Sequence, residues 1–221
     1  MSNCCDDSIP YTRATLAPAV AAATTTTTTP VVPPTIVEGS SFKWTTLAND
    51  AASSNGSIWR ESSSSLSAWT FASTGLSVTS FPVDKDSGFE FKVNLPATDE
   101  TRVGLVHTNA TAAESMSPFF LEFSAGNVYV DGGGSVATTV TSGDWFRFLH
   151  NYTDQTVAYQ KKDAQGVYQT FATSTSFTRG QVLYADFATQ GAQNGIVGAK
   201  YIYGGSFEFS SGTSTSAGSG S

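Results

Sequence analysis

Charged residues are scarce in this chain: they make up 13% of its 221 residues, against about a quarter in ordinary globular domains. The eleven Lys and Arg are outnumbered by eighteen Asp and Glu and are scattered along the sequence, and the net charge is −7. A protein that binds nucleic acid needs a basic face. We therefore expect neither nucleic acid nor an anionic membrane as a partner.

Cysteine is nearly absent, since the sequence contains only the neighbours Cys4 and Cys5. Two adjacent cysteines form a strained ring if they pair with each other, so we expect no disulfide to brace the fold. Free thiols and disulfides to other chains both remain open. Long apolar runs are absent as well, and no segment approaches the eighteen or so residues that span a bilayer. The sequence therefore predicts no membrane span.

Residues that favour strands are abundant instead, including Thr and the aromatic residues (15 Phe, 8 Tyr and 4 Trp). From residue 37 to residue 210, short segments such as Phe89–Val93 alternate apolar and polar side chains between Gly, Asn, Asp and Ser. The expected strands are 66–71, 76–78, 89–93, 103–106, 119–123, 128–130, 136–140, 145–149, 156–160, 168–173, 182–187, 196–203 and 207–209. Many short strands without helices predict an all-β fold, an antiparallel two-sheet sandwich.

The two ends of the chain differ from this middle part. Residues 1–36 contain six consecutive threonines and a proline-rich stretch, which cannot form a packed core and favour extended geometry. We predict an N-terminal arm or stalk over 1–36, the sandwich domain over 37–210, and a flexible Gly/Ser tail over 211–221.

Several segments of the middle part resemble the concanavalin A-like jelly roll and, within it, the SPRY-like domains. They are Val103-Gly104-Leu105, Phe120–Phe123, Asn127–Asp131, the Gly143-Asp144 turn before Trp145-Phe146, and the hairpin from Val157 to Tyr168. The family's usual Asn-Gly turn is replaced here by Asp163-Ala164-Gln165-Gly166. The resemblance implies a jelly-roll sandwich that binds proteins or glycans rather than a catalyst.

Catalytic and metal-binding patterns are weak. Glu90, Glu122 and Glu208 each stand between apolar residues, and strand alternation explains this with Phe pointing inward and Glu outward. A glycosidase needs two carboxylates on one face, which no strand shows. The two histidines, His107 and His150, have no metal-site spacing, and the segment 84–88 lacks the later ligands of a Ca²⁺ loop. We expect no catalytic residues, no metal and no cofactor.

Tryptophans are the better candidates for a binding site. Trp44, Trp59 and Trp69 lie in the early, Ser-rich part, where 53–57 and 62–65 are expected to be loops. A sugar ring stacks on an aromatic face, and nearby Asn, Asp and Ser supply hydrogen bonds. The alternative is that these three side chains close the core. Trp145, after the Gly143-Asp144 turn, is expected in the core.

The layout of arm, sandwich and tail is similar to that of virion surface proteins, minor capsid proteins and fibre heads. This resemblance implies a non-catalytic structural or binding protein on a virion surface or outside cells. Its head would contact a glycan or a neighbouring protein, its arm would bind other capsid or assembly proteins, and a homo-oligomer would fit the layout. The alternatives are a secreted carbohydrate-binding lectin, a concanavalin-like glycoside hydrolase and an intracellular SPRY-like adaptor.

Overall fold

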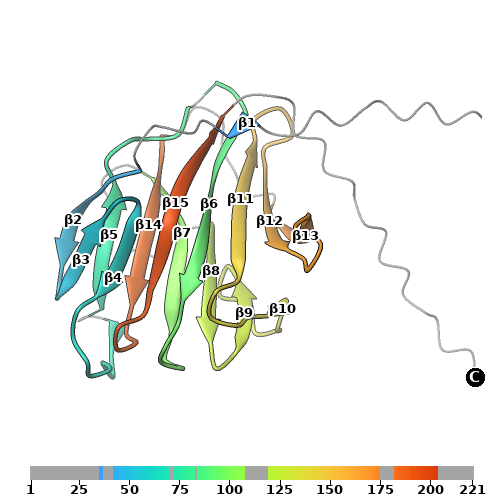
Figure 1. Ribbon diagram of the computed structural model, residues 1–221. Helices are drawn as coiled ribbons and strands as arrows, with labels where there is room; N and C mark the ends of the chain where they lie inside the picture. Colours follow the sequence, from blue (N-terminus) through green and yellow to red (C-terminus); the bar gives the residue numbers. More distant parts are fainter. Residues whose placement is uncertain are drawn as a thin grey trace, which may run out of the picture. The chain divides into compact units, whose positions relative to one another are not determined.

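The computed structural model describes residues 35–36, 42–69, 72–82, 84–107, 119–174 and 182–203, all within the compact unit Val31–Ser221. These residues form fifteen strands in two antiparallel sheets (Figure 1). The expected strand 207–209, the tail and nearly all of the arm lie outside the described residues. Within the described part, no helix is long and apolar enough to cross a membrane.

One sheet has eight strands, in the order β13-β12-β11-β6-β15-β4-β3, with β1 paired to β15. Its strands are β1 (Thr35–Ile36), β3 (Ala51–Ser54), β4 (Ser57–Arg60), β6 (Ser87–Asn94), β11 (Trp145–Asn151), β12 (Thr156–Lys162), β13 (Tyr168–Ser174) and β15 (Gly195–Tyr203). The other sheet has seven, in the order β10-β9-β8-β7-β14-β5-β2. These are β2 (Trp44–Ala48), β5 (Ser73–Ser77), β7 (Thr101–His107), β8 (Phe119–Ser124), β9 (Asn127–Val130), β10 (Thr138–Thr139) and β14 (Leu183–Thr189).

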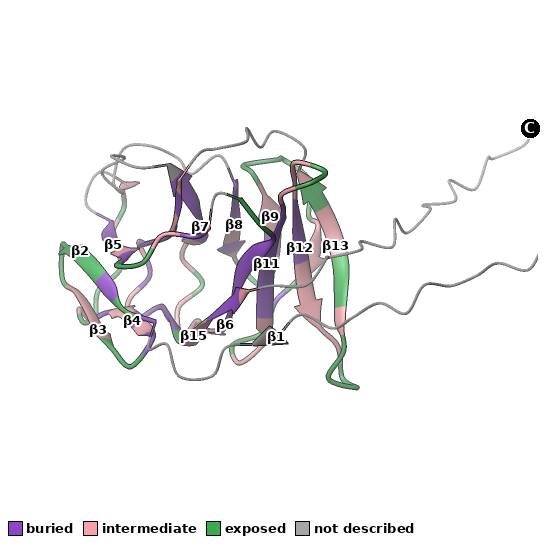
Figure 2. Ribbon diagram, turned by 90° about the horizontal axis from the view of Figure 1, so that it is seen from above, coloured by how far each residue is buried: buried purple, intermediate pink, exposed green. Residues whose placement is uncertain are grey.

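The core lies between the two sheets and is built largely from phenylalanine. Phe89 and Phe91 of β6 are fully buried, as the alternation of that segment predicts. The ring of Phe89 stacks on Phe148 of β11, with centroids 5.1 Å apart, and Phe91 meets the edge of Phe123 of β8 at 6.4 Å. Figure 2 shows the buried segments concentrated in the central strands such as β6 and β11. The predicted jelly-roll sandwich is confirmed.

A tight hairpin stands where a serine-rich loop was expected over 53–57. Strands β3 and β4 pair around Asn55 and Gly56, whose φ angles of 48° and 79° suit a two-residue type I′ turn. A Cβ on Gly56 would lie 2.8 Å from the carbonyl oxygen of Ala199, so glycine is required there. The loop expectation is wrong because the turn-forming Asn-Gly pair outweighs the low strand propensity of serine.

Two other expectations from the sequence are also wrong. The stretch 66–69 is not a strand; it runs outside both sheets, and Leu66 N–H donates to the carbonyl of Gln190 at 2.9 Å. Trp145 is not a core residue. In β11 the alternation turns Phe146 and Phe148 inward, and Trp145 therefore faces outward and is only partly buried.

Two buried titratable groups have displaced pKa values. Burial lowers the pKa of His150, an inward residue of β11, to about 4, against a smaller opposing effect of the Asp86 charge. Burial raises the pKa of Asp186 on β14 to about 7, partly countered by a hydrogen bond from the backbone of Phe187. His150 therefore folds as the neutral imidazole.

The histidine makes stability dependent on pH. Below about pH 6.5 the unfolded chain binds a proton at His150 that the folded protein does not, so the free energy of unfolding falls until about pH 4. We expect His150→Leu to remove up to about 3 kcal/mol of this loss. Urea denaturation of both proteins at pH 7, 5.5 and 4 measures the difference, in which the common contribution of Asp186 cancels. Parallel pH profiles would contradict the assignment.

Candidate functional site

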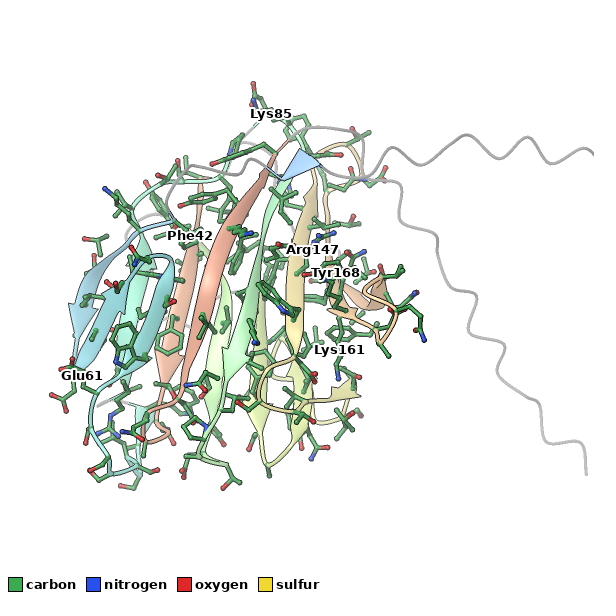
Figure 3. All side chains as sticks on the ribbon, in the orientation of Figure 1. Phe42, Glu61, Lys85, Arg147, Lys161 and Tyr168 are labelled. Carbon is green, nitrogen blue, oxygen red and sulfur yellow. The ribbon has the colours of Figure 1, made fainter. Side chains whose placement is uncertain are left out.

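A cleft of about 520 Å³ opens at the end of the eight-stranded sheet where β4, β6 and the turn before β15 meet. We name it the Trp59 cleft; its lining consists of Trp59, Arg60, Glu61, Asn94, Pro96 and Gln193. Glu61 projects from the edge of the molecule beyond β4 (Figure 3). The volume lies within the range of small-molecule sites in proteins.

Strand register explains why Trp59 and Asn94 share this cleft. Gly195 of β15 pairs with Trp59 on one side and with Asn94 on the other, so the three residues form one row. Because neighbouring strands lie about 4.8 Å apart, Trp59 and Asn94 are roughly 10 Å apart across the sheet. A Cβ on Gly195 would approach the Ile58 carbonyl oxygen and lie 2.6 Å from the Cβ of Trp59. No side chain of β15 therefore separates the indole from the amide.

The wall of the cleft is held by the buried side chain of Asn194. Its amide nitrogen donates to the carbonyls of Ala97 and Asp99, at 3.2 and 3.1 Å, and to the hydroxyl of Thr101 at 3.0 Å. Its amide oxygen accepts from the N–H of Ala97 at 2.9 Å. These bonds join the turn that carries Gln193 to the segment that carries Pro96, so the cleft is preformed.

Arg60 also contributes to the lining of the cleft, but strand alternation turns its side chain to the inner face together with Ile58. Arg60 is 2% exposed, and its Nη1 donates to the carbonyl of Ser64. Within the described part of the chain, no carboxylate forms an ion pair with Arg60, and its Nε has no hydrogen-bond partner. Glu61 beside it is exposed. The exposed charge in the lining of the cleft is therefore that of Glu61 and not that of Arg60.

A second polar cluster occupies the middle of the same sheet face. The carboxylate of Glu90 accepts from Nη2 of Arg147 at 2.8 Å and from the hydroxyl of Tyr168 at 3.1 Å. The Tyr168 ring covers the guanidinium of Arg147 at 3.7 Å (Figure 3). Burial raises the pKa of Tyr168, and the charge of Glu90 raises it further. Glu90 and Arg147 are 6% and 7% exposed, so this is a buried ion pair.

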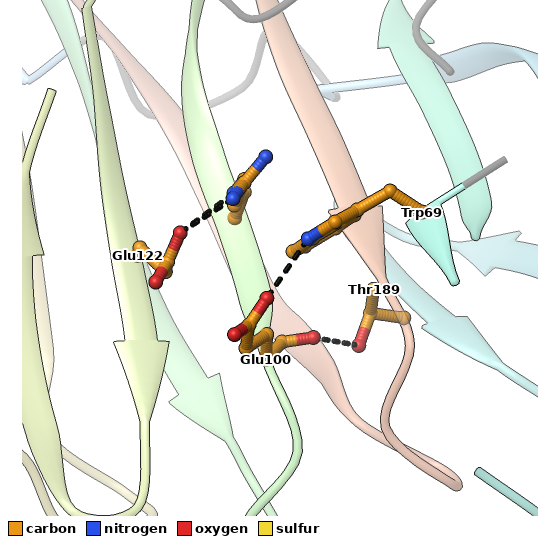
Figure 4. A network of polar contacts seen from close by, with 5 residues as sticks. Trp69, Glu100, Glu122 and Thr189 are labelled. Atoms are coloured by element: carbon orange, nitrogen blue, oxygen red, sulfur yellow. Dashed lines mark hydrogen bonds and ion pairs between the residues drawn. The ribbon is translucent and has the colours of Figure 1, made fainter. Parts of the chain in front are cut away.

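The other two candidate tryptophans lie elsewhere. Trp44 is 7% exposed, donates its indole N–H to the carbonyl of Gly56 at 3.1 Å, and belongs to the core. Trp69 lies on the outer side of the seven-stranded sheet, where its indole N–H donates to Glu100 at 2.8 Å and the Arg102 guanidinium covers its ring at 3.9 Å (Figure 4). The structure thus separates the three residues, and only Trp59 lines a described cleft.

Of the three candidate glutamates, Glu90 and Glu122 lie within the described residues. Glu90 and Glu122 face outward while their phenylalanine neighbours face inward, as expected. They lie on different sheets, and each is ion-paired, Glu122 with Arg102 at 2.7 Å. Glu208 lies outside the described residues. Among the described residues, no group of three or more His, Cys, Asp and Glu could hold a metal ion.

No protein-family model matches the sequence, and no curated protein is significantly similar to it. Solved structures are similar in fold. The legume lectin-like domain from Entamoeba histolytica matches with a TM-score of 0.51 and 8% identity, over 75% of this chain and 91% of that chain. The TRIM65 PSpry domain matches with a TM-score of 0.51 and 8% identity, over 75% and 93%. The concanavalin-like resemblance is confirmed at the level of the fold.

The buried ion pair leads to a test by paired substitutions. Arg147→Met leaves the Glu90 carboxylate buried without its cation and should lower the free energy of unfolding by about 3 kcal/mol. Glu90→Met combined with Arg147→Met should recover most of that loss, because both desolvated charges are gone. Denaturation by guanidinium chloride measures both proteins. A double variant less stable than Arg147→Met alone would show that the pair does not behave as a desolvated unit.

Proposed function

We propose that this protein is a non-catalytic binding module whose Trp59 cleft holds one sugar residue of a glycan. The observation that carries the proposal is the composition of the cleft: an indole and two amide side chains, those of Asn94 and Gln193, on a preformed wall. A pyranose offers an apolar C–H face and a ring of hydroxyl groups. The indole matches the face, and the amides both donate to and accept from the hydroxyls.

The carboxylates support binding rather than hydrolysis. Glycoside hydrolysis requires two carboxyl groups about 5–10 Å apart on either side of the scissile bond. The lining of the Trp59 cleft contains one, Glu61, which is exposed. Glu90 is engaged by Arg147 and Tyr168 and is positioned as a structural acceptor.

The location of the protein rests on its layout. A Thr/Pro-rich arm over 1–36 and a short Gly/Ser tail support a virion-surface or extracellular protein, with the arm binding neighbouring subunits. Sedimentation of the full chain and of a chain without residues 1–34, which keeps β1, tests this placement. Identical oligomeric states and identical subunit binding would contradict a docking arm.

A variant of the cleft tests the sugar site. Trp59→Ala removes the stacking surface, and we expect glycan affinity to fall about 10- to 100-fold, the equivalent of the burial of one large aromatic side chain. A glycan array probed with the full chain identifies the ligand, and isothermal titration calorimetry then gives the affinities. Trp69→Ala is the matched control, since it removes an equally large indole on the other sheet.

The result for the control variant distinguishes the loss of a sugar site from a general effect on the structure. Equal losses in the two variants would indicate a general structural effect, and unchanged binding by Trp59→Ala would place the sugar elsewhere. Circular dichroism of each variant verifies that the sandwich is retained.

A further inference from the structure

The outer face of the eight-stranded sheet collects cations that are far apart in the sequence. Lys92 pairs with Trp145 on one side and with Val197 on the other, and Lys162 pairs with Tyr168. The Lys162 ammonium lies 5.6 Å from the Trp145 ring and 5.5 Å from the Tyr168 ring. A row of alternating cations and rings therefore crosses β6, β11, β12 and β13, with Val197 of β15 beside its first member. We name it the basic row.

The next row adds Arg147, Glu90 and Lys200, which lie opposite one another on β11, β6 and β15. Arg147 is neutralised by Glu90, whereas within the described part of the chain no carboxylate forms an ion pair with Lys92, Lys162 or Lys200. Three uncompensated ammonium groups thus share one face of a chain whose net charge is −7. Strand register thus places together on this face cations that are scattered along the sequence.

The basic row continues into the Trp59 cleft. On β6, Asn94 of the cleft is two residues from Lys92, and on β15, Gly195 is two residues from Val197. Residues two apart on a strand point to the same face, about 7 Å apart. One ligand can therefore contact the cleft and the row together.

We infer that the glycan is an acidic oligosaccharide, with carboxylate or sulfate groups, that runs from the Trp59 cleft along the basic row. This inference rests on the sugar site proposed above. Lys92 and Lys162 are two strands apart, roughly 10 Å, with the ring of Trp145 between them. The spacing suits acidic groups on alternate sugars, each beside a ring that can stack. A nucleic acid fits less well, because it carries a phosphate on every nucleotide, a denser charge than lysines roughly 10 Å apart can pair with.

The experiment uses the full chain and four hexasaccharide probes. The acidic probe is a hyaluronan hexasaccharide, its matched control is the same molecule with carboxylates reduced to alcohols, and chitohexaose is the neutral reference. We expect the acidic probe to bind at least tenfold more tightly than its reduced form at 50 mM salt. The advantage should shrink at 300 mM salt, because exposed charges are then screened. A chondroitin sulfate hexasaccharide carries sulfate groups in addition to the carboxylates, so tighter binding than that of hyaluronan would show that sulfate contributes.

Paired lysine variants locate the effect. Lys92→Gln with Lys162→Gln should abolish the advantage of the acidic probe while leaving the reduced probe within about twofold. Lys43→Gln with Lys85→Gln is the control, since it removes the same charge from exposed positions outside the basic row. If both double variants lost the affinity advantage of the acidic probe equally, the advantage would come from net charge alone, and the inference would be overturned.

The remaining outcomes separate the inference from the sugar site. Equal binding of the acidic and reduced probes, lost in Trp59→Ala, would keep the sugar site and overturn the acidic ligand. Failure of every hexasaccharide to bind would overturn both. A single-stranded hexanucleotide is the last arm: if it binds more tightly than hyaluronan and depends on Lys92 and Lys162, the face belongs to nucleic acid.

Discussion

The alternation of side chains along β6 is the constraint on which the rest of the molecule depends. Phe89, Phe91 and Val93 enter the core, where they pack against β11 and the opposite sheet. Because the side-chain period of a strand is two, the same packing sends Glu90, Lys92 and Asn94 to the outer face. A slip of one residue would bury three polar side chains. Core packing therefore fixes the outer-face residues of β6 in their positions.

The outer face also carries a buried ion pair that joins neighbouring strands. Desolvating Glu90 and Arg147 costs free energy that the close contact and the hydroxyl of Tyr168 offset only with good geometry. A pair of this kind adds specificity more than stability. Together with Tyr168 it joins β6, β11 and β13 beside the basic row. The hydrogen bonds of Asn194 likewise join separate segments of the chain beside the Trp59 cleft. The proposed binding surface is thus held in place by the packed core on its inner side and by these polar contacts next to it.

The sequence predicts the fold from local alternation, as Phe89–Val93 illustrates, since burial of one strand face needs no knowledge of its partners. The Asn55-Gly56 pair is typical of a two-residue hairpin turn, but the serines around it favoured the interpretation of this stretch as a loop. Trp145 was misplaced because its position after the Gly143-Asp144 turn was taken to indicate the core, whereas Phe146 and Phe148 occupy the inward positions of that strand. The basic row could not be read from the sequence, because it depends on the register of strands whose order departs from sequence order.

The four tryptophans offer the most direct test that the outer face of the eight-stranded sheet is the binding surface. Each indole N–H gives its own signal in a ¹⁵N-resolved NMR spectrum, and single Trp→Phe variants assign them. On titration with the hyaluronan hexasaccharide, the signals of Trp59 and Trp145 should shift, while those of Trp44 in the core and Trp69 on the other sheet should stay. Shifts confined to Trp69, or signals that do not move while binding is detected by calorimetry, would contradict the account.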